Sequence, residues 1–314
     1  MFNARVAIVF SGQGTQYVGM GRICCEDFPV AREIFDLADR VLAEDEPDFS
    51  LSKTCFKGSE EDLAMTINAQ PAILTVSYIY YLIHREQLQL RGLEPIFVAG
   101  HSLGYYTALV VANAIDFVDA VRLVRERGRL MQKAAEETPG GMVAILGLDK
   151  EIIGRICKET GVEISNFNCT GGQIVLNQIV ISGLNESLVQ ACERAKEMGA
   201  RKVYRLPTAG AFHSRWMLPT EAGMRDAFSR VKLRNSDIPI IGNSNAEPLS
   251  SPDEIMAESI RQLSSPVQWV GSIERMTKEG VSTFIEVGPG KVLSGLIKGI
   301  DPKVTVIHIK EVVG

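Results

Sequence analysis

The sequence predicts an α/β fold in which a large domain is interrupted by a smaller one. Up to about Pro139, short apolar runs typical of strands alternate with longer segments of helical periodicity, as in a parallel sheet covered by helices. After Pro139-Gly140-Gly141 the segments shorten, and two strand-like runs follow each other without a helix between them. The chain has 314 residues, 46% of them hydrophobic, which suffices for one large core and a smaller one.

Residues 1–139 are predicted to form the first part of the large domain. The long apolar helix from Pro71 to Leu88 is expected to be buried on most sides. Asp116 and Asp119 are expected at the start of the last helix, as N-cap residue and first-turn acid. In chain order, the predicted elements are a strand at 6–10, a helix from about 30 to 42, a short helix at 60–65, the helix at 71–88, a strand at 96–99, a helix from about 105 to 112 and a helix at 117–137.

Residues 140–207 are predicted to form the inserted small domain. The predicted elements are a strand at 142–146, a helix at 150–160, strands at 162–167 and 178–182, a helix at 185–198 and a strand at 201–206. The order βαββαβ within about 70 residues is that of a ferredoxin-like unit.

Residues 208–314 are predicted to return to the large domain, which is therefore discontinuous (1–139 and 208–314). The turn Gly288-Pro289-Gly290 is expected to open the last helix. The other predicted elements are helices at 218–231, near 252–263 and at 269–278, and strands at 238–241, 283–287 and 304–309.

The composition excludes several classes of protein. The net charge is −5 and no block of Lys and Arg is present, which argues against nucleic acid or an anionic membrane as the main partner. No apolar run reaches the roughly 18–20 residues of a membrane span, and the apolar stretch at 6–10 is too short and too early for a signal peptide. The six cysteines show no C-x-x-C pair and no metal spacing, so we expect no metal site. We also expect the protein to be located in a reducing cytoplasm.

The pentapeptide Gly100-His101-Ser102-Leu103-Gly104 lies between a predicted strand and a predicted helix. A G-x-S-x-G turn in this context is typical of a nucleophile elbow, which exposes the serine hydroxyl beside a helix N-terminus. The two glycines are expected because a Cβ at either position would crowd the neighbouring strand or helix. Ser102 is thus the predicted nucleophile.

A serine nucleophile needs a base, and the chain has four histidines. His213 follows the inserted domain in a stretch of small residues, where a cleft between domains is expected, and is the predicted base. His84 and His308 lie in a predicted helix and strand and are interpreted as structural. His101 is expected to point away from Ser102 and to pack or hydrogen-bond under the turn. No acid gives a clear triad signal, so a backbone carbonyl could orient the imidazole instead.

Two further segments carry candidate site residues. Ser11-Gly12-Gln13-Gly14 follows the first strand without a phosphate-loop motif, and its glycines free the backbone of Gln13 to act as a second oxyanion donor. Arg127 precedes Gly128 inside a predicted helix, where glycine costs about 1 kcal/mol and suggests a close approach. A buried guanidinium there would bind a carboxylate. Its neighbours are interpreted as a solvated face: Arg122, Arg125 and Arg129.

Seven blocks in order, spread over nearly the whole chain, resemble the malonyl-CoA:acyl carrier protein transacylase family, which includes polyketide-synthase acyltransferases. The family implies an α/β-hydrolase-like core with a parallel sheet and a ferredoxin-like insert. The blocks are Phe10 to Gln16, Ala69-Gln70-Pro71-Ala72, Gly100 to Gly104, Arg127 to Gln132, Gly210-Ala211-Phe212-His213-Ser214, Pro266-Val267-Gln268-Trp269 and Glu286 to Leu293.

The resemblance implies a role for each matching residue. Ser102 would be the nucleophile and His213 the general base, held by the main-chain carbonyl of Gln262, which explains the missing acid. Gln13 and the Leu103 backbone N–H would form the oxyanion hole.

The remaining matches concern the substrate. Arg127 would pair with the free carboxylate of a malonyl group, and Gln70 and His101 would line the pocket. Phe212 is similar to malonyl-selective members, whose bulky ring leaves less space for an α-methyl branch.

The chain departs from the family pattern at three places. Tyr105 stands where the family usually has Glu, and Ser11 replaces a common Pro. The 166–178 turn is longer than usual. These changes remove no catalytic group and bear on the elbow's outer support and on partner choice.

The resemblance implies a two-step acyl transfer without a cofactor, from malonyl-CoA as substrate to the phosphopantetheine thiol of an acyl carrier protein. A monomer is compatible with this role, and fatty-acid and polyketide synthesis both remain open. The alternatives are a thioester hydrolase that clears carrier proteins, a transferase with another acyl preference, and an inactive interaction domain. Retention of Arg127 argues against the hydrolase, and intact Ser102, His213 and Gln13 argue against the inactive domain.

Overall fold

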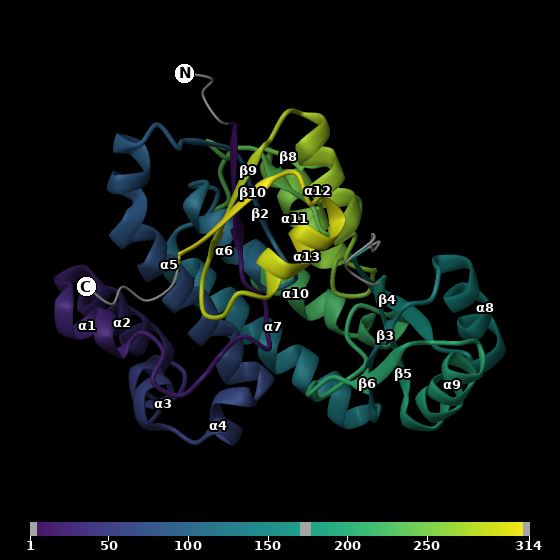
Figure 1. Ribbon diagram of the computed structural model, residues 1–314. Coiled ribbons are helices and arrows are strands. Elements are labelled where there is room, and N and C mark those ends of the chain that lie inside the picture. The colour runs from purple at the N-terminus through teal and green to yellow at the C-terminus, as the bar shows by residue number, and fades with distance from the viewer. Residues whose placement is uncertain (1–4, 170–176, 310–314) are drawn as a thin grey trace.

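The computed structural model describes residues 5–169 and 177–309 and has a mixed α/β fold built on two sheets (Figure 1). The larger sheet has six strands in the order β10-β9-β1-β2-β7-β8, and all neighbours run parallel except β7 and β8. Its strands are β1 (Val6–Phe10), β2 (Pro95–Gly100), β7 (Ile240–Ile241), β8 (Pro248–Leu249), β9 (Thr283–Val287) and β10 (Thr305–Ile309).

The centre of this sheet places three loops at one edge. Strand β1 is buried throughout, as expected for a parallel strand covered on both faces. Its last residue, Phe10, is in register with Gly100 of β2 and Val287 of β9. The loops that follow β1, β2 and β9 therefore leave the sheet side by side at its carboxyl edge, where α/β proteins bind ligands.

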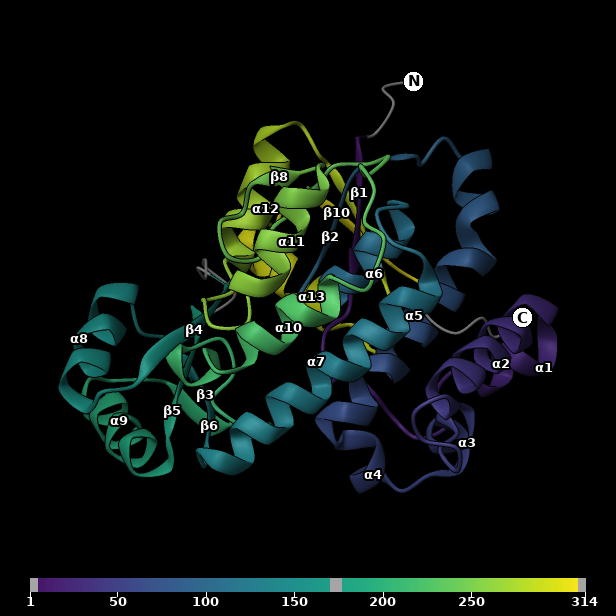
Figure 2. The same cartoon turned by 180° about the vertical axis from the view of Figure 1, so that it is seen from behind.

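Helices cover both faces of the large sheet. The predicted helices are confirmed, with shifted ends, and two short helices, α1 and α3, were not predicted. Seen from behind, α7 runs diagonally across the molecule toward the small sheet (Figure 2). The helices are α1 (Arg22–Asp27), α2 (Pro29–Ala43), α3 (Leu51–Lys57), α4 (Glu60–Ala64), α5 (Thr66–Leu90), α6 (Gly104–Val111), α7 (Phe117–Glu137), α10 (Thr220–Phe228), α11 (Pro252–Arg261), α12 (Trp269–Lys278) and α13 (Val292–Ile300), with a 3-10 turn at Arg215–Met217.

The prediction that the long helix begins at Pro71 is wrong, because α5 begins at Thr66 and contains the proline. A proline inside a helix leaves the carbonyl four residues earlier without its N–H donor. Here that carbonyl belongs to Ile67, and it accepts a hydrogen bond from Arg125 Nη1 at 3.0 Å. The arginine replaces the missing donor, so the helix continues through Pro71.

Two side chains near the start of α7 differ from expectation. Asp116 occupies the N-cap position, but its carboxylate makes no cap bond and pairs with Arg234 at 2.7 Å. The Arg125 side chain is only 13% exposed and bonds Asn68 as well as Ile67, so it does not belong to a solvated face. Arg122 and Arg129 are solvated as predicted.

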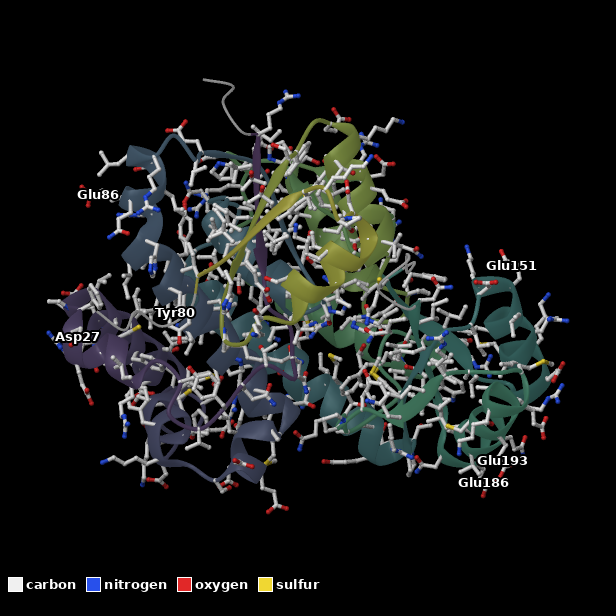
Figure 3. The ribbon with its side chains drawn as sticks, in the orientation of Figure 1. Asp27, Tyr80, Glu86, Glu151, Glu186 and Glu193 are labelled. Atoms are coloured by element: carbon white, nitrogen blue, oxygen red, sulfur yellow. The ribbon has the colours of Figure 1, made fainter. Side chains whose placement is uncertain are left out.

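The small sheet is antiparallel, with four strands in the order β4-β5-β3-β6. Helices α8 (Lys150–Thr160) and α9 (Asn185–Glu197) bury Ile153, Ile156 and Leu188 against it. Their acidic side chains point outward (Figure 3): Glu151, Glu186 and Glu193. The strands are β3 (Gly140–Leu146), β4 (Glu163–Cys169), β5 (Gln178–Leu184) and β6 (Lys202–Arg205). Most of the expected long turn at 166–178 falls on residues 170–176, outside the described residues.

Backbone hydrogen bonds join the small sheet to the large body. Val267, in the segment after α11, donates to the Ser165 carbonyl at 2.8 Å and accepts from Phe167 N–H at 2.9 Å. On the other side, Ser182 Oγ donates to the Phe212 carbonyl at 2.7 Å. These bonds join the small sheet to the segments that carry Val267 and Phe212, and Phe212 directly precedes His213. Within residues 5–169 and 177–309, no helix has the length and hydropathy needed to cross a bilayer.

Candidate active site

Ser102 occupies a strained turn between β2 and α6. Its φ is 51°, a left-handed conformation that costs a non-glycine residue about 1–3 kcal/mol. A Cβ on Gly100 would lie 1.9 Å from the Gly104 carbonyl carbon, and one on Gly104 would lie 2.1 Å from the Phe10 carbonyl oxygen. The crowding expected at both glycines is confirmed, and only glycine lets the turn pack between strand and helix.

The hydroxyl of Ser102 meets the imidazole of His213. Ser102 Oγ and His213 Nε2 are 2.7 Å apart, and His213 Nδ1 lies 2.7 Å from the carbonyl oxygen of Gln262. Because a carbonyl can only accept, Nδ1 carries the proton and Nε2 is left to accept the proton of the hydroxyl. The structure thus brings together three residues that are separate in the sequence, without a carboxylate.

Burial keeps His213 neutral. Its side chain is almost fully buried, and desolvation followed by the nearby Arg127 charge lowers the pKa of His213 to about 3, against the opposing effect of the Gln262 carbonyl. At neutral pH the imidazole is therefore unprotonated, the form in which a general base works.

Arg127 is fully buried beside the nucleophile. Its Nη1 donates to Gln70 Oε1 at 2.8 Å and its Nη2 donates to Ser102 Oγ at 3.1 Å, while the guanidinium lies 5.5 Å from the centre of the Tyr106 ring. Burial lowers the pKa of this group, but guanidinium remains charged in proteins. Among the described residues no carboxylate bonds to it, and its Nε has no partner. A buried cation of this kind is suited to an anionic ligand.

Gly128 brings Arg127 close to the site. A Cβ there would lie 2.7 Å from both Ile67 Cα and the Thr66 carbonyl oxygen, so α7 and α5 touch backbone to backbone. The close approach predicted at this glycine is confirmed, and the partner is the start of α5. Gln70, one turn further along α5, then reaches both Arg127 and Met131, the latter at 3.5 Å.

The loop after β1 and the elbow each carry a backbone N–H group without an acceptor among the described residues. A Cβ on Gly12 would lie 2.5 Å from the His101 carbonyl oxygen, so the loop after β1 lies directly against the elbow. In the described part of the chain, the N–H groups of Gln13 and Leu103 donate to no acceptor. Leu103 also caps α6, where the helix dipole favours negative charge. The Gln13 side chain bonds Thr66 Oγ1 at 3.3 Å.

His101 joins the elbow to the small sheet. Its Nε2 lies 2.9 Å from Asn168 Oδ1 at the end of β4, and its ring meets Trp269 edge-on. Burial lowers the pKa of His101, so it is neutral at pH 7. The His101 ring therefore bonds Asn168 and not Ser102. This agrees with the prediction that His101 points away from Ser102 and forms a hydrogen bond under the turn.

Asn243 contacts the elbow and was not predicted. Its Oδ1 accepts from the Ser102 N–H at 2.7 Å, and its Nδ2 donates to the Gly100 carbonyl at 2.9 Å. Asn243 lies two residues after the end of β7, at the same carboxyl edge as Ser102, and that position in the sequence was a usable signal.

Two of the three departures from the family pattern, Tyr105 and Ser11, lie among the described residues, and both leave the site intact. Tyr105 is buried, and its hydroxyl donates to the Ile255 carbonyl of α11 at 3.5 Å, the long limit of a hydrogen bond. Ser11 is buried, and its hydroxyl has no partner among the described residues. Phe212, beside His213, is also buried.

Comparison with known proteins shows the family. Residues 7–313 match the acyl transferase domain family. The chain is 40% identical over 313 residues to the malonyl CoA-acyl carrier protein transacylase of Bacillus subtilis (strain 168), covering 98% of this chain and 94% of that protein. It is similar, with a TM-score of 0.88 and 36% identity, to an acyl carrier protein S-malonyltransferase from Vibrio cholerae O1 biovar eltor str. N16961, covering 98% of both chains. A malonyl-transacylase solved in complex with its type II PKS acyl-carrier protein has a TM-score of 0.91 at 34% identity, covering 98% of this chain and 97% of that chain. The chain therefore belongs to the acyl transferase domain family.

Proposed function

We propose that this protein transfers a malonyl group from malonyl-CoA to the phosphopantetheine thiol of an acyl carrier protein. One observation carries the proposal: Ser102 Oγ lies 2.7 Å from a neutral base, His213, and 3.1 Å from a buried cation, Arg127. The base suits a serine nucleophile, and the cation suits an acyl group that bears a free carboxylate.

In the first step, Ser102 attacks the thioester carbonyl of malonyl-CoA while His213 Nε2 takes its proton. The carbonyl oxygen becomes an oxyanion next to the unpaired N–H groups of Gln13 and Leu103. The tetrahedral intermediate collapses as the thiolate of CoA leaves with a proton from His213. The product is a malonyl ester on Ser102.

In the second step, the thiol of the carrier protein gives its proton to His213 and attacks the ester. Ser102 leaves with the proton that His213 returns, and the malonyl group is now a thioester on the carrier. The relatives named above as acting with acyl carrier protein support this acceptor. No cofactor takes part in either step.

Selectivity for malonyl would come from Arg127. Its Nη2 lies close enough to Ser102 Oγ that the carboxylate of a malonyl ester needs little movement of the guanidinium to meet it. An acetyl group would leave this buried charge unpaired, which is costly. Gln70 fixes the guanidinium, and the ring of Phe212 would limit an α-methyl branch.

We also propose that the large sheet is an α/β-hydrolase-like core, residues 1–139 and 208–314, with a ferredoxin-like insert at 140–207. The order βαββαβ with antiparallel strands arranged β4-β5-β3-β6 supports the insert. A cytoplasmic location and a monomeric state stay predictions of the sequence.

The test is incubation with malonyl-CoA, methylmalonyl-CoA or acetyl-CoA, followed by the mass of the intact protein. We expect a malonyl adduct that Ser102→Ala abolishes, and little adduct with the other two. An acetyl adduct as fast as the malonyl adduct would overturn the selectivity, and the absence of any adduct would overturn the proposal.

A further inference from the structure

We infer that Asn243 is a positioning residue that holds the Ser102 turn in its reactive conformation, and that helix α11 supports both Ser102 and His213. The inference rests on the proposed function only in taking Ser102 as the nucleophile. It concerns a residue outside the catalytic set that the sequence predicts.

The side-chain amide of Asn243 spans the elbow. It accepts from the Ser102 N–H at 2.7 Å and donates to the Gly100 carbonyl at 2.9 Å, so one amide binds the backbone on both sides of His101. Ser102 has a φ of 51°, which must be held by its surroundings to persist. The two bonds of Asn243 supply that restraint.

The same contact decides which N–H groups remain for the reaction. Because Ser102 N–H is already bonded to Asn243, it is not available to an oxyanion. The next N–H along the chain, that of Leu103, has no acceptor among the described residues. Asn243 therefore restrains the residue that carries the hydroxyl and directly precedes the Leu103 N–H.

Asn243 is itself held by α11 and by the start of α12. Its backbone carbonyl accepts from the Gln268 N–H at 2.7 Å. The adjacent Ser244 donates its N–H to Glu258 Oε1 at 2.8 Å and its hydroxyl to Glu258 Oε2. Glu258 is a fully buried carboxylate on α11, paired with Arg261 at 3.0 Å.

The residue that orients the base directly follows helix α11. Gln262 follows the last residue of α11, one turn after Glu258, and its carbonyl accepts from His213. The helix thus reaches the nucleophile through Glu258, which bonds Ser244 next to Asn243, and it reaches the base through Gln262. One helix is therefore connected to both partners of the 2.7 Å contact between Ser102 Oγ and His213 Nε2.

The test is the rate at which a fluorophosphonate that carries neither CoA nor a carboxylate modifies Ser102, followed by intact-protein mass. Asn243→Ala should slow this reaction by about 10- to 100-fold, the effect expected of a misplaced reacting group. The midpoint of its pH profile should stay that of the wild type, because the bond between His213 and Gln262 remains. Asn245→Ala is the matched control: Asn245 is exposed two residues away, accepts only from the Glu247 N–H in its own turn, and should react at the wild-type rate.

A folded Asn243→Ala protein that reacts at the wild-type rate overturns the inference. If Asn243→Ala does not fold, the same rate is measured for Asn243→Asp. This variant keeps the acceptor for the Ser102 N–H but loses the donor to the Gly100 carbonyl. A rate below the wild type supports the inference and an equal rate overturns it. A wild-type protein that is not modified at Ser102 would instead refute the proposed function, so the two failures are distinguishable.

Discussion

Ser102 has two neighbours with opposite electrostatic effects. His213 must be neutral to accept the proton of the hydroxyl, whereas Arg127 must be charged to bind a carboxylate. The Arg127 charge lowers the pKa of His213, so in the free protein the cation weakens the base. A carboxylate bound to Arg127 would offset that charge and strengthen the base. A substrate that carries a carboxylate would therefore improve its own acylation.

The pH dependence of acylation follows from the direction of this pKa shift. His213 acts when unprotonated, so kcat/KM should fall only as the pH drops well below the ordinary histidine value of about 6.5. In the malonyl-bound complex the acid limb of kcat should lie at a higher pH than that of kcat/KM. Stopped-flow acylation between pH 4 and 8 checks this, and an acid limb of kcat/KM at or above about 6.5 would contradict it.

The lowered pKa of His213 also makes the stability of the fold depend on pH. In the unfolded chain, His213 binds a proton once the pH falls below about 6.5. In the folded chain, the same imidazole stays unprotonated until the pH reaches about 3. The free energy of unfolding should therefore decrease as the pH falls through this window, and His213→Gln should weaken the dependence. Urea unfolding of both proteins at several pH values measures it. Parallel curves for the two proteins would count against the buried neutral imidazole.

Removing the guanidinium tests the role of Arg127 directly. Arg127→Ala should lower kcat/KM for malonyl-CoA roughly 100-fold, the value of a lost charge-assisted hydrogen bond, and lower that for acetyl-CoA much less. Arg129→Ala is the control, since Arg129 is half exposed on the same helix and pairs only with Glu126 in its hydrogen bonds. An unchanged preference for malonyl in Arg127→Ala would exclude the carboxylate role.

At the scale of elements, the contact between α5 and α7 positions the groups that we propose bind the substrate carboxylate. Gly128 lets the helices touch, and Gln70 and Arg127 then meet across the contact. Arg125 supports the same contact from its other side by bonding the Ile67 carbonyl that Pro71 leaves free. The position of the proposed carboxylate-binding groups therefore depends on backbone packing between the two helices.

Gly128→Ala should disturb this contact. Its new methyl group would lie 2.7 Å from backbone atoms of α5, and overpacking of this kind costs about 1–3 kcal/mol. Both the melting temperature and malonyl transfer should fall. Gly154→Ala in α8 is the control: apart from its chain neighbours and the backbone of its own helix, no described atom lies within 4 Å of the added methyl, and alanine favours a helix interior by about 0.5–1 kcal/mol. Equal melting temperatures for the two variants would contradict the packing argument.

At the scale of the whole molecule, the sequence predicted the features that depend on local patterns. The strand, turn and helix around Ser102 are visible in neighbouring residues, as are the glycines that the turn requires. The helix start at Thr66 was not predictable, because the donor that replaces the Pro71 N–H comes from Arg125 on another helix. Asn243 was missed because its partners lie about 140 residues earlier in the chain, although its place after a predicted strand was a usable signal.

The meeting of His213 with Gln262 came from the family resemblance. Their hydrogen bond joins the return from the small sheet to the end of α11, and no local pattern indicates it. The sequence is most informative where function depends on a tight turn. It is least informative where distant loops meet at the carboxyl edge of the sheet.

The most direct measurement isolates the malonyl-enzyme, removes CoA and mixes the adduct with a carrier protein that bears phosphopantetheine. The account predicts that the mass of one malonyl group leaves the enzyme and appears on the carrier within one turnover, faster than the adduct decays in buffer. Release of free malonate with no gain of mass on the carrier would contradict it and would assign the site to a thioester hydrolase.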